Sequence, residues 1–230
     1  LICLFILAYF SLKYFPRPWT YRPRYGLART LISFGLRNQV GKIAGQIQAQ
    51  YAKYLLTSIS SLALSSYSIA TSLIQKGTGA VTQLATALYP QVASRPIRSL
   101  YYRLQLGLLV LALLGVLLYS LFGYPFLLWW LDDYAIVNAV AQVLQVLVWS
   151  FVLLVPTPLA STVLDGLGRP GITSVFAVVT VTLEIILAFI FWPYNHLLAP
   201  IYANLIALLF TTPILLLTVE RQLSRVKSSL

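Results

Sequence analysis

Residues 104–130 read LQLGLLVLALLGVLLYSLFGYPFLLWW and contain no charged side chain. A helix needs about 20 mainly apolar residues to cross the hydrocarbon core of a bilayer, so this stretch is long enough. Trp129 and Trp130 close the run, and aromatic side chains are typical of the membrane interface. Asp132 and Asp133 follow as a short acidic turn. The stretch therefore predicts a transmembrane helix.

Further helical segments, most of them apolar, are predicted on both sides of this stretch. They cover residues 1–14, 30–59, 62–92, 135–161, 172–192 and 201–219. The whole sequence is 59% hydrophobic and 9% charged, whereas a soluble domain carries about 25% charged residues. We therefore expect an all-α, polytopic membrane helix bundle with about seven spans. Pro156 and Pro158 should kink the fifth span near one end.

The basic residues gather in alternate loops. Residues 13–29, residues 95–103, Arg169 and the tail hold most of them, whereas the other loops hold Asp132, Asp133 and His196. Loops rich in lysine and arginine stay on the cytoplasmic side. We expect these loops and the C-terminus to be cytoplasmic. The net charge of +11 then reflects topology and contact with membrane lipids, and nucleic acid is not an expected partner.

The first apolar run, residues 1–14, is too short for a span and does not begin with methionine. No basic residue precedes it and no clear cleavage site follows, which argues against a signal peptide. We expect it to be the end of a transmembrane helix whose earlier part, with earlier spans, is missing. Pro16, Pro18 and Pro23 then forbid a regular helix in the basic loop that follows.

One predicted span, residues 30–59, is unusually polar. At 100° per residue, six polar side chains share an arc of about 120°; they are Asn38, Gln39, Lys42, Gln46, Gln50 and Lys53. A lysine that faced lipid would cost about 2.5–3.5 kcal/mol at the centre of a helix. This face therefore lines an aqueous cavity for a polar, anionic substrate, or the helix lies in the headgroup plane. The alternation of the loops favours a crossing helix, and Gly41 and Gly45 would permit close helix approach.

Glu184 is the only acidic residue well inside a predicted apolar span. An unpaired carboxylate there is costly. It could pair with Lys42 or Arg37, take up a proton and serve ion coupling, or be a structural glutamate bonded to a neighbour.

The sequence offers little for catalysis, and we expect neither an enzyme nor a bound cofactor. No zinc-protease, CxxC, nucleophile-elbow or P-loop pattern is present. Cys3 and His196 are the only residues of their kinds. Asp132 and Asp133 could form a metal or glycosyl-donor pair, although a solvated turn is the simpler interpretation.

Two stretches resemble a known family. Residues 65–95 match its "Y-s-x-A … l-x-P-x-x-s" helix, and residues 158–174 match its "L-x-a-x-G-r" turn. The matching residues are Tyr67, Ser68, Ala70, Pro90, Ser94, Leu164, Gly168 and Arg169. The family is the polysaccharide (O-antigen) flippases of Wzx type, within the multidrug/oligosaccharidyl-lipid/polysaccharide (MOP) exporter superfamily.

The resemblance implies a transporter with two six-helix lobes. Residues 1–14 would be the final helix of a missing N-terminal lobe, and residues 15–29 the cytoplasmic loop between the lobes. Residues 30–219 would be the C-terminal lobe, and residues 220–230 a basic tail. The partner would be that missing lobe or a second chain.

The implied activity is the movement of undecaprenyl-diphosphate-linked oligosaccharides across the inner membrane for polysaccharide and lipopolysaccharide biosynthesis. Lys42 and Arg37 would attract the diphosphate, and Gln39, Gln46 and Gln50 would bond to sugar hydroxyls, with Lys53 on the same face. A cation-coupled multidrug exporter of the same superfamily, a membrane glycosyltransferase or polymerase, and a non-transporting subunit remain alternatives. The lysines argue against the drug exporter, which would favour an acidic cavity.

Overall fold

A computed structural model describes residues 25–94 and 98–227. The chain forms two structural units, residues 1–36 and 37–230. Of the first unit the structure describes residues 25–36, the opening turns of helix α2. The second unit contains the rest of that helix and the other described helices.

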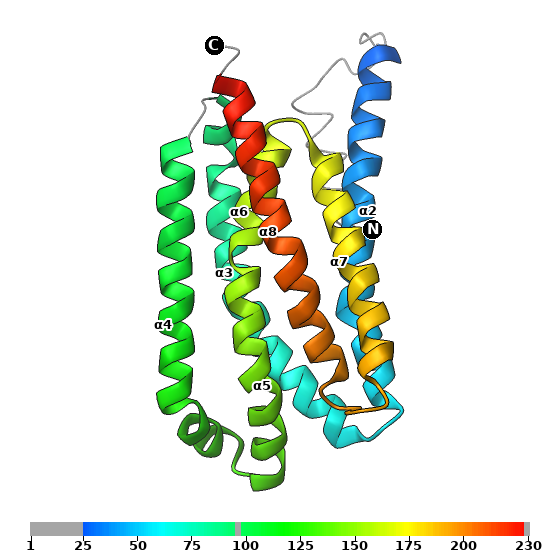
Figure 1. The fold of residues 1–230 in the computed structure, drawn as a ribbon, viewed down its shortest axis with the longest axis vertical. Helices are drawn as coiled ribbons and strands as arrows, with labels where there is room; N and C mark the ends of the chain where they lie inside the picture. Colours follow the sequence, from blue (N-terminus) through cyan, green and yellow to red (C-terminus); the bar gives the residue numbers. More distant parts are fainter. Residues whose placement is uncertain (1–24, 95–97, 228–230) are drawn as a thin grey trace, which may run out of the picture. The chain divides into compact units, whose positions relative to one another are not determined.

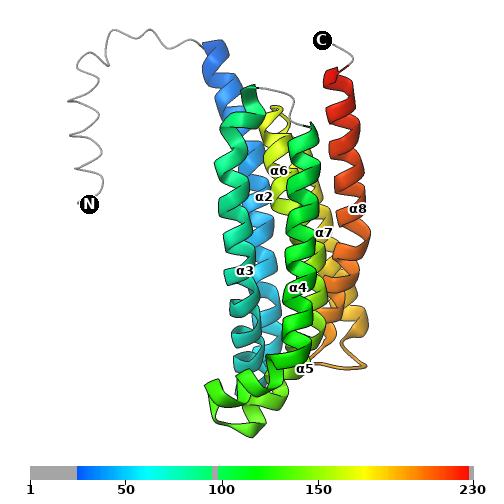
Figure 2. The ribbon, with the colours of Figure 1, turned by 90° about the vertical axis from the view of Figure 1, so that its left-hand side faces the viewer.

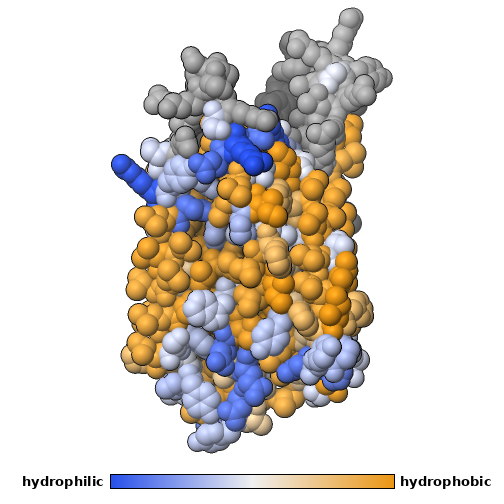
Figure 3. Space-filling view, viewed as in Figure 1, coloured by the Kyte–Doolittle hydropathy of each residue, from blue (hydrophilic) through white to orange (hydrophobic). Residues whose placement is uncertain are grey.

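Every regular element of the described residues is a helix, which confirms the expected all-α class. The elements are α2 (Tyr25–Thr57), α3 (Ser61–Ser94), α4 (Arg98–Leu131), α5 (Tyr134–Leu154), α6 (Pro156–Gly166), α7 (Pro170–Phe191) and α8 (Ala199–Lys227). Helices α3 to α8 lie side by side along one common direction (Figures 1 and 2). Their middle sections carry an apolar surface, with hydrophilic residues gathered toward the ends (Figure 3).

Four segments are long and apolar enough to cross a membrane: Ser99–Leu131, Tyr134–Gly166, Pro170–Phe191 and Ala199–Ser224. Helices α2 and α3 are as long, at 33 and 34 residues, but more polar. The described residues thus contain six of the seven expected helical segments, because α5 and α6 together form one, and four of the six are apolar enough to cross a membrane. The seventh, residues 1–14, lies outside the described residues.

Helix boundaries differ from the expected ones where no residue breaks the helix. Helix α2 begins at Tyr25, inside the range assigned to the loop, because no proline follows Pro23 there. Helix α8 continues to Lys227, through the first part of the expected tail. Leu223 is buried on this last section, so the tail begins as a packed helix.

The break between α5 and α6 is produced by Pro156 and Pro158. Because Pro158 has no N–H to donate to the Leu154 carbonyl, that oxygen accepts from Thr157 Oγ1 at 2.7 Å instead. Two other helices support the same bend. Thr212 Oγ1 of α8 donates to the Leu153 carbonyl at 3.2 Å, and Gln105 Nε2 of α4 donates to the Pro156 carbonyl at 3.2 Å.

Four residues of the two motifs have structural roles in the described part of the chain. Tyr67 and Ala70 belong to one buried cluster, together with Leu127, Val140 and Ile201. Leu164 lies in a second cluster nearer the chain's C-terminal end. Gly168 adopts φ +74° in the turn before α7, a conformation that strains residues with a side chain.

Gly41 and Gly45, four residues apart on α2, have different environments. A Cβ added at Gly41 would lie 3.0 Å from Ser174 Oγ and 3.3 Å from Ser174 Cα of α7, whereas one added at Gly45 would meet nothing within 4 Å. Only Gly41 therefore provides the close helix approach expected of both. Because lipid gives helices no hydrophobic reason to associate, such small residues allow backbones to approach.

We predict that Gly41→Ala loosens α2 from α7, whereas the matched Gly45→Ala does not. Alanine favours a helix over glycine by about 1 kcal/mol, so Gly45→Ala should be neutral or stabilising. Overpacking costs about 1–3 kcal/mol, which should cancel or exceed that gain at Gly41. Thermal unfolding of the two variants in detergent checks this, and equal midpoints would contradict the close contact.

Candidate functional site

The most unusual group in the described bundle is the carboxylate of Glu184 on α7, whose residue is only 2% exposed. Oε2 accepts hydrogen bonds from Gln48 Nε2 at 2.6 Å and from Asn204 Nδ2 at 3.0 Å. Oε1 accepts from the Tyr51 hydroxyl at 2.7 Å. Three neutral donors therefore surround the carboxylate, and we call these four side chains the Glu184 cage.

The Glu184 cage joins three helices. Gln48 and Tyr51 come from α2, one turn apart, and Asn204 comes from α8. Helix α2 has few other buried side chains: Ala44, Ala52 and Leu56 in the described part. The cage is thus a main polar attachment of α2 to α7 and α8.

A cavity of about 220 Å³ borders the Glu184 cage. Helix α2 contributes Gly45, Gln48 and Ala49 to its wall. The other helices contribute Tyr67, Thr71, Ile74, Gln75, Leu147, Leu154, Pro200, Ile201 and Asn204, besides Glu184 itself. No lysine, arginine or second acidic residue lines this cavity. Glu184 is therefore the only charge-bearing group at its wall.

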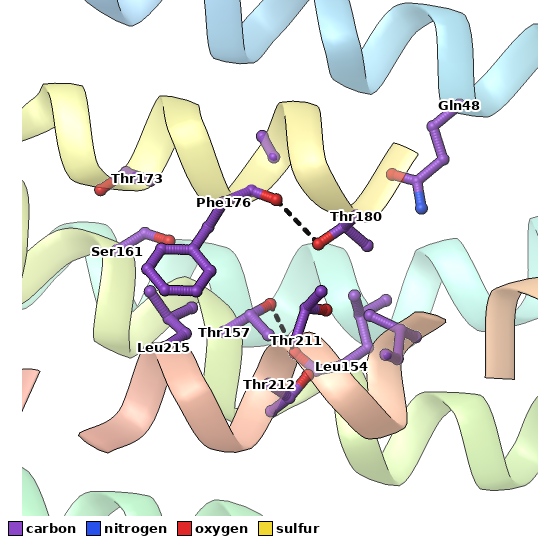
Figure 4. Close-up of a pocket in the computed structure, with 12 residues that line it drawn as sticks. Gln48, Leu154, Thr157, Ser161, Thr173, Phe176, Thr180, Thr211, Thr212 and Leu215 are labelled. Atoms are coloured by element: carbon purple, nitrogen blue, oxygen red, sulfur yellow. Dashed lines mark hydrogen bonds between the residues drawn. The ribbon is translucent and has the colours of Figure 1, made fainter. Parts of the chain in front are cut away.

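A second cavity, of about 170 Å³, lies between α2, α6, α7 and α8 (Figure 4). Six hydroxyl side chains line it: Thr157, Ser161, Thr173, Thr180, Thr211 and Thr212. We call it the hydroxyl cavity. Gln48 and Leu154 line both cavities, so the two adjoin.

The polar face expected on α2 lies on the surface of this unit. Gln39, Lys42, Gln46 and Gln50 are exposed, and Lys53 is half-buried. The side chain of Arg37 lies outside the part that the structure describes. None of these residues lines the cavity beside Glu184 or the hydroxyl cavity. The face is open to whatever adjoins this unit.

The structure does not bring Lys42 to Glu184. Gln48, Tyr51 and Asn204 occupy the carboxylate, and none of the described residues forms an ion pair with it. The apolar side chains of α2 that lie opposite its polar face are also exposed, for example those of Val40, Ile43 and Ile47. The face of α2 that packs against the bundle is neither of these two and consists of small residues and Gln48. Helices in lipid commonly pack through small residues and polar contacts.

Sequence reasoning missed a second polar stripe, on α3. Its exposed residues are Ser72, Gln75, Lys76, Gly79, Thr82, Gln83 and Thr86. They recur every three or four positions, which is the spacing of one helix face. That spacing is visible in the sequence, and it shows that α3, like α2, has one polar face. Asn204, a lone amide in an apolar run, was a similar signal.

The remaining candidates have structural roles. Asp133 caps α5, accepting from the Ala135 and Ile136 amides at 2.8 and 3.3 Å. His196 packs edge-on against Trp192, with ring centroids 4.9 Å apart. Asp165 accepts from Thr173 Oγ1 at 3.1 Å. In the described ranges, no three His, Cys, Asp or Glu residues gather as metal ligands would.

Comparison with known proteins gives a consistent result. The MatE family model matches residues 52–190, more than half of the chain. No curated protein matches the sequence. Two solved structures share the fold at a TM-score of 0.62 and 15% identity, over 81% of this chain and 43% of theirs. The chain therefore spans less than half the length of either.

One of the two is a MOP superfamily transporter from Pyrococcus furiosus Vc1 (DSM3638), described as having a binding pocket of reverse polarity that suggests a different function. The other is an outward-facing multidrug resistance MATE family transporter of the same superfamily.

Proposed function

The chain belongs to the MatE family, and from that premise we propose that it forms the C-terminal lobe of a transporter for lipid-linked oligosaccharides. Members of this family are membrane transporters rather than enzymes. The proposed substrate is an undecaprenyl-diphosphate-linked sugar repeat, and the proposed membrane is the bacterial inner membrane. The missing N-terminal lobe, or a second chain, would complete the transporter.

The charge of the two polar helices carries this proposal. Helices α2 and α3 contain Arg29, Arg37, Lys42, Lys53 and Lys76, and no acidic residue. Lys42 and Lys76 are exposed in the structure. A diphosphate headgroup is attracted to such a surface, whereas a cationic drug is repelled. The exposed amides of Gln39, Gln46 and Gln50 supply donors and acceptors for sugar hydroxyls.

We propose that the exposed polar faces of α2 and α3 adjoin the N-terminal lobe and line the substrate path between the two lobes. A path of this kind keeps a sugar–diphosphate headgroup in water, while the lipid tail stays in the bilayer. Exposing the lysine and glutamine side chains of these faces to lipid would be unfavourable in free energy.

The Glu184 cage is the proposed ion-coupling site. A buried ionisable group inside a membrane bundle marks an ion or proton site by default. The carboxylate of Glu184 can take up a proton. Alternatively, a monovalent cation can bind to that carboxylate, to the Tyr51 hydroxyl oxygen and to the amide oxygens, once the amides rotate. Tyr51 and Tyr67 are the other titratable groups facing Glu184.

The basic ends of the helices give the proposed orientation. Arg103, Arg169 and Arg221 are exposed at the end of the bundle where α6 joins α7 and α8 ends. The positive-inside rule assigns that end to the cytoplasm. The loop that carries Asp132 and Asp133 would then face the periplasm.

A binding measurement on the complete protein in detergent tests the substrate class. Undecaprenyl diphosphate linked to a sugar should raise the melting temperature, whereas a cationic amphiphile such as a quaternary ammonium drug should not. The rise should shrink in the Lys42→Ala variant and persist in Arg221→Ala, a matched loss of charge outside the polar faces. Stabilisation by the drug alone would favour the multidrug exporter that one of the two solved structures represents.

A further inference from the structure

The hydroxyl cavity lies beside prolines of two membrane segments, one of which is broken there while the other stays helical. Pro156 and Pro158 separate α5 from α6, and Pro213 lies inside α8. Leu154, Thr157, Thr211 and Thr212 line the cavity beside these interruptions. Proline removes a backbone hydrogen bond of a helix, and the cavity wall includes residues next to these prolines in both segments. The cavity is therefore part of the fold rather than a gap left by one small side chain.

The wall combines six hydroxyl side chains, which can bind water, with a larger apolar surface. Empty protein cavities are apolar, whereas cavities with several polar partners hold water, each molecule occupying about 30 Å³ in the liquid. A volume of about 170 Å³ with six hydroxyl groups satisfies both conditions. Thr157, Thr180 and Thr211 each donate to a backbone carbonyl, which leaves their oxygen lone pairs able to accept from water.

Each end of the hydroxyl cavity leads to a carboxylate. At one end Gln48 lines the cavity and donates to Glu184 Oε2 at 2.6 Å. At the other end Thr173 lines the cavity and donates to Asp165 Oδ1 at 3.1 Å. Asp165 is half-buried and is the penultimate residue of α6, directly before the turn to α7. No basic side chain lines the route between the two carboxylates.

We propose that the hydroxyl cavity is a hydrated route, inside this lobe, by which water and a proton or small monovalent cation travel between Asp165 and Glu184. The proposal rests on the proposed coupling role of Glu184 and adds the path by which its ion leaves or arrives. Gln48 is the point of passage, because its amide borders both cavities. The hydroxyl cavity is lined by α6, α7 and α8, apart from Gln48 and Leu154, and so lies away from the exposed faces of α2 and α3.

Single cysteines test hydration directly, in the complete protein with all other thiols removed. A thiol reacts with methanethiosulfonate reagents as the thiolate, which forms in water but poorly in lipid or a dry core, so a difference of about tenfold or more is expected. The test variants are Ser161→Cys and Ala177→Cys, because Ser161 and Ala177 line the cavity. Their neighbours are matched controls: Ala160 is fully buried in the core, and Val178 is exposed on the outer face of α7.

The expected result is fast modification at residues 161 and 177 and slow modification at residues 160 and 178. Equal rates within each pair would overturn the proposal. Because this readout needs no transport, it stands apart from the test of the proposed function.

A second measurement tests the connection to Glu184. The Ser161→Cys protein is first modified with a bulky thiol reagent, and Glu184 is then labelled with a water-soluble carbodiimide and a charged amine, read by mass spectrometry. Blocking the cavity should lower labelling of Glu184 several-fold, with Glu220 as the internal reference. Unchanged labelling of Glu184 would show a hydrated cavity that is no route, and would overturn the proposal. Labelling repeated in sodium and in choline medium distinguishes a bound cation, which protects Glu184, from a proton.

Discussion

The Glu184→Gln variant is expected to lose ion-coupled transport while keeping helix α2 in place. Glutamine retains an acceptor oxygen for part of the cage, and the amides of Gln48 and Asn204 can rotate to meet its new N–H group. It carries no charge and takes up no proton, so coupling through this site ends. Coupling free energies of 1–3 kcal/mol correspond to a loss of about 5- to 150-fold. Uptake into proteoliposomes under an ion gradient measures this.

The Glu184→Leu variant separates coupling from structure. Leucine leaves the three half-buried donors of the cage without their acceptor, and an unsatisfied donor costs up to about 1–3 kcal/mol where water cannot reach it. We therefore expect lower thermal stability and faster hydrogen exchange in α2, which Glu184→Gln should not show. Glu220→Gln is the matched control, because Glu220 accepts from the Tyr102 hydroxyl at 2.8 Å near the end of α8, away from the cage. If Glu184→Gln transported like the unaltered protein, the coupling role would be wrong.

Charge reversal on the polar face of α2 is expected to have the second large effect. Lys42→Glu places an anion where the diphosphate is proposed to pass, and like charges brought together cost several kcal/mol. A loss of 1.4 kcal/mol already corresponds to a tenfold rise in the apparent KM, so a rise of about tenfold or more is expected. Initial rates of flipping over a range of lipid-linked substrate concentrations measure it.

The controls for Lys42→Glu test whether the effect comes from the charge at this position. Lys42→Arg should keep most of the activity, and Arg221→Glu, an exposed reversal outside the polar faces, should leave the KM unchanged. Raising the ionic strength should reduce the difference between Lys42→Glu and the unaltered protein, because salt screens exposed charges beyond about 10 Å at 0.1 M. An unchanged KM in Lys42→Glu would remove the cationic path from the account.

The helices themselves could be predicted from the sequence, because length and apolarity decide whether a segment crosses a bilayer. The run at residues 104–130 became α4, and the prolines at 156 and 158 divided the fifth span as their missing N–H groups require. Helix ends were less predictable. Nothing in residues 25–29 or 220–224 breaks a helix, so α2 and α8 extend beyond the apolar runs.

A polar environment for Glu184 could be predicted, because an unpaired carboxylate inside an apolar span is costly. Its partners could not. The hydrophobic arc of α2 predicts burial for a soluble protein, but in lipid an apolar side chain can face outward. The buried face of α2 therefore contains Gly41, Ala44, Gln48 and Ala52 instead of the apolar arc, and it brings Gln48 to Glu184. Only the packing of α2, α7 and α8 reveals this.

The most direct test is flipping itself, measured with the complete protein in proteoliposomes that contain a fluorescent undecaprenyl-diphosphate-linked oligosaccharide. The account predicts that an ion gradient drives the labelled lipid from one leaflet to the other, and that a cationic drug is not exported. Export of the drug without movement of the lipid-linked sugar would contradict the account.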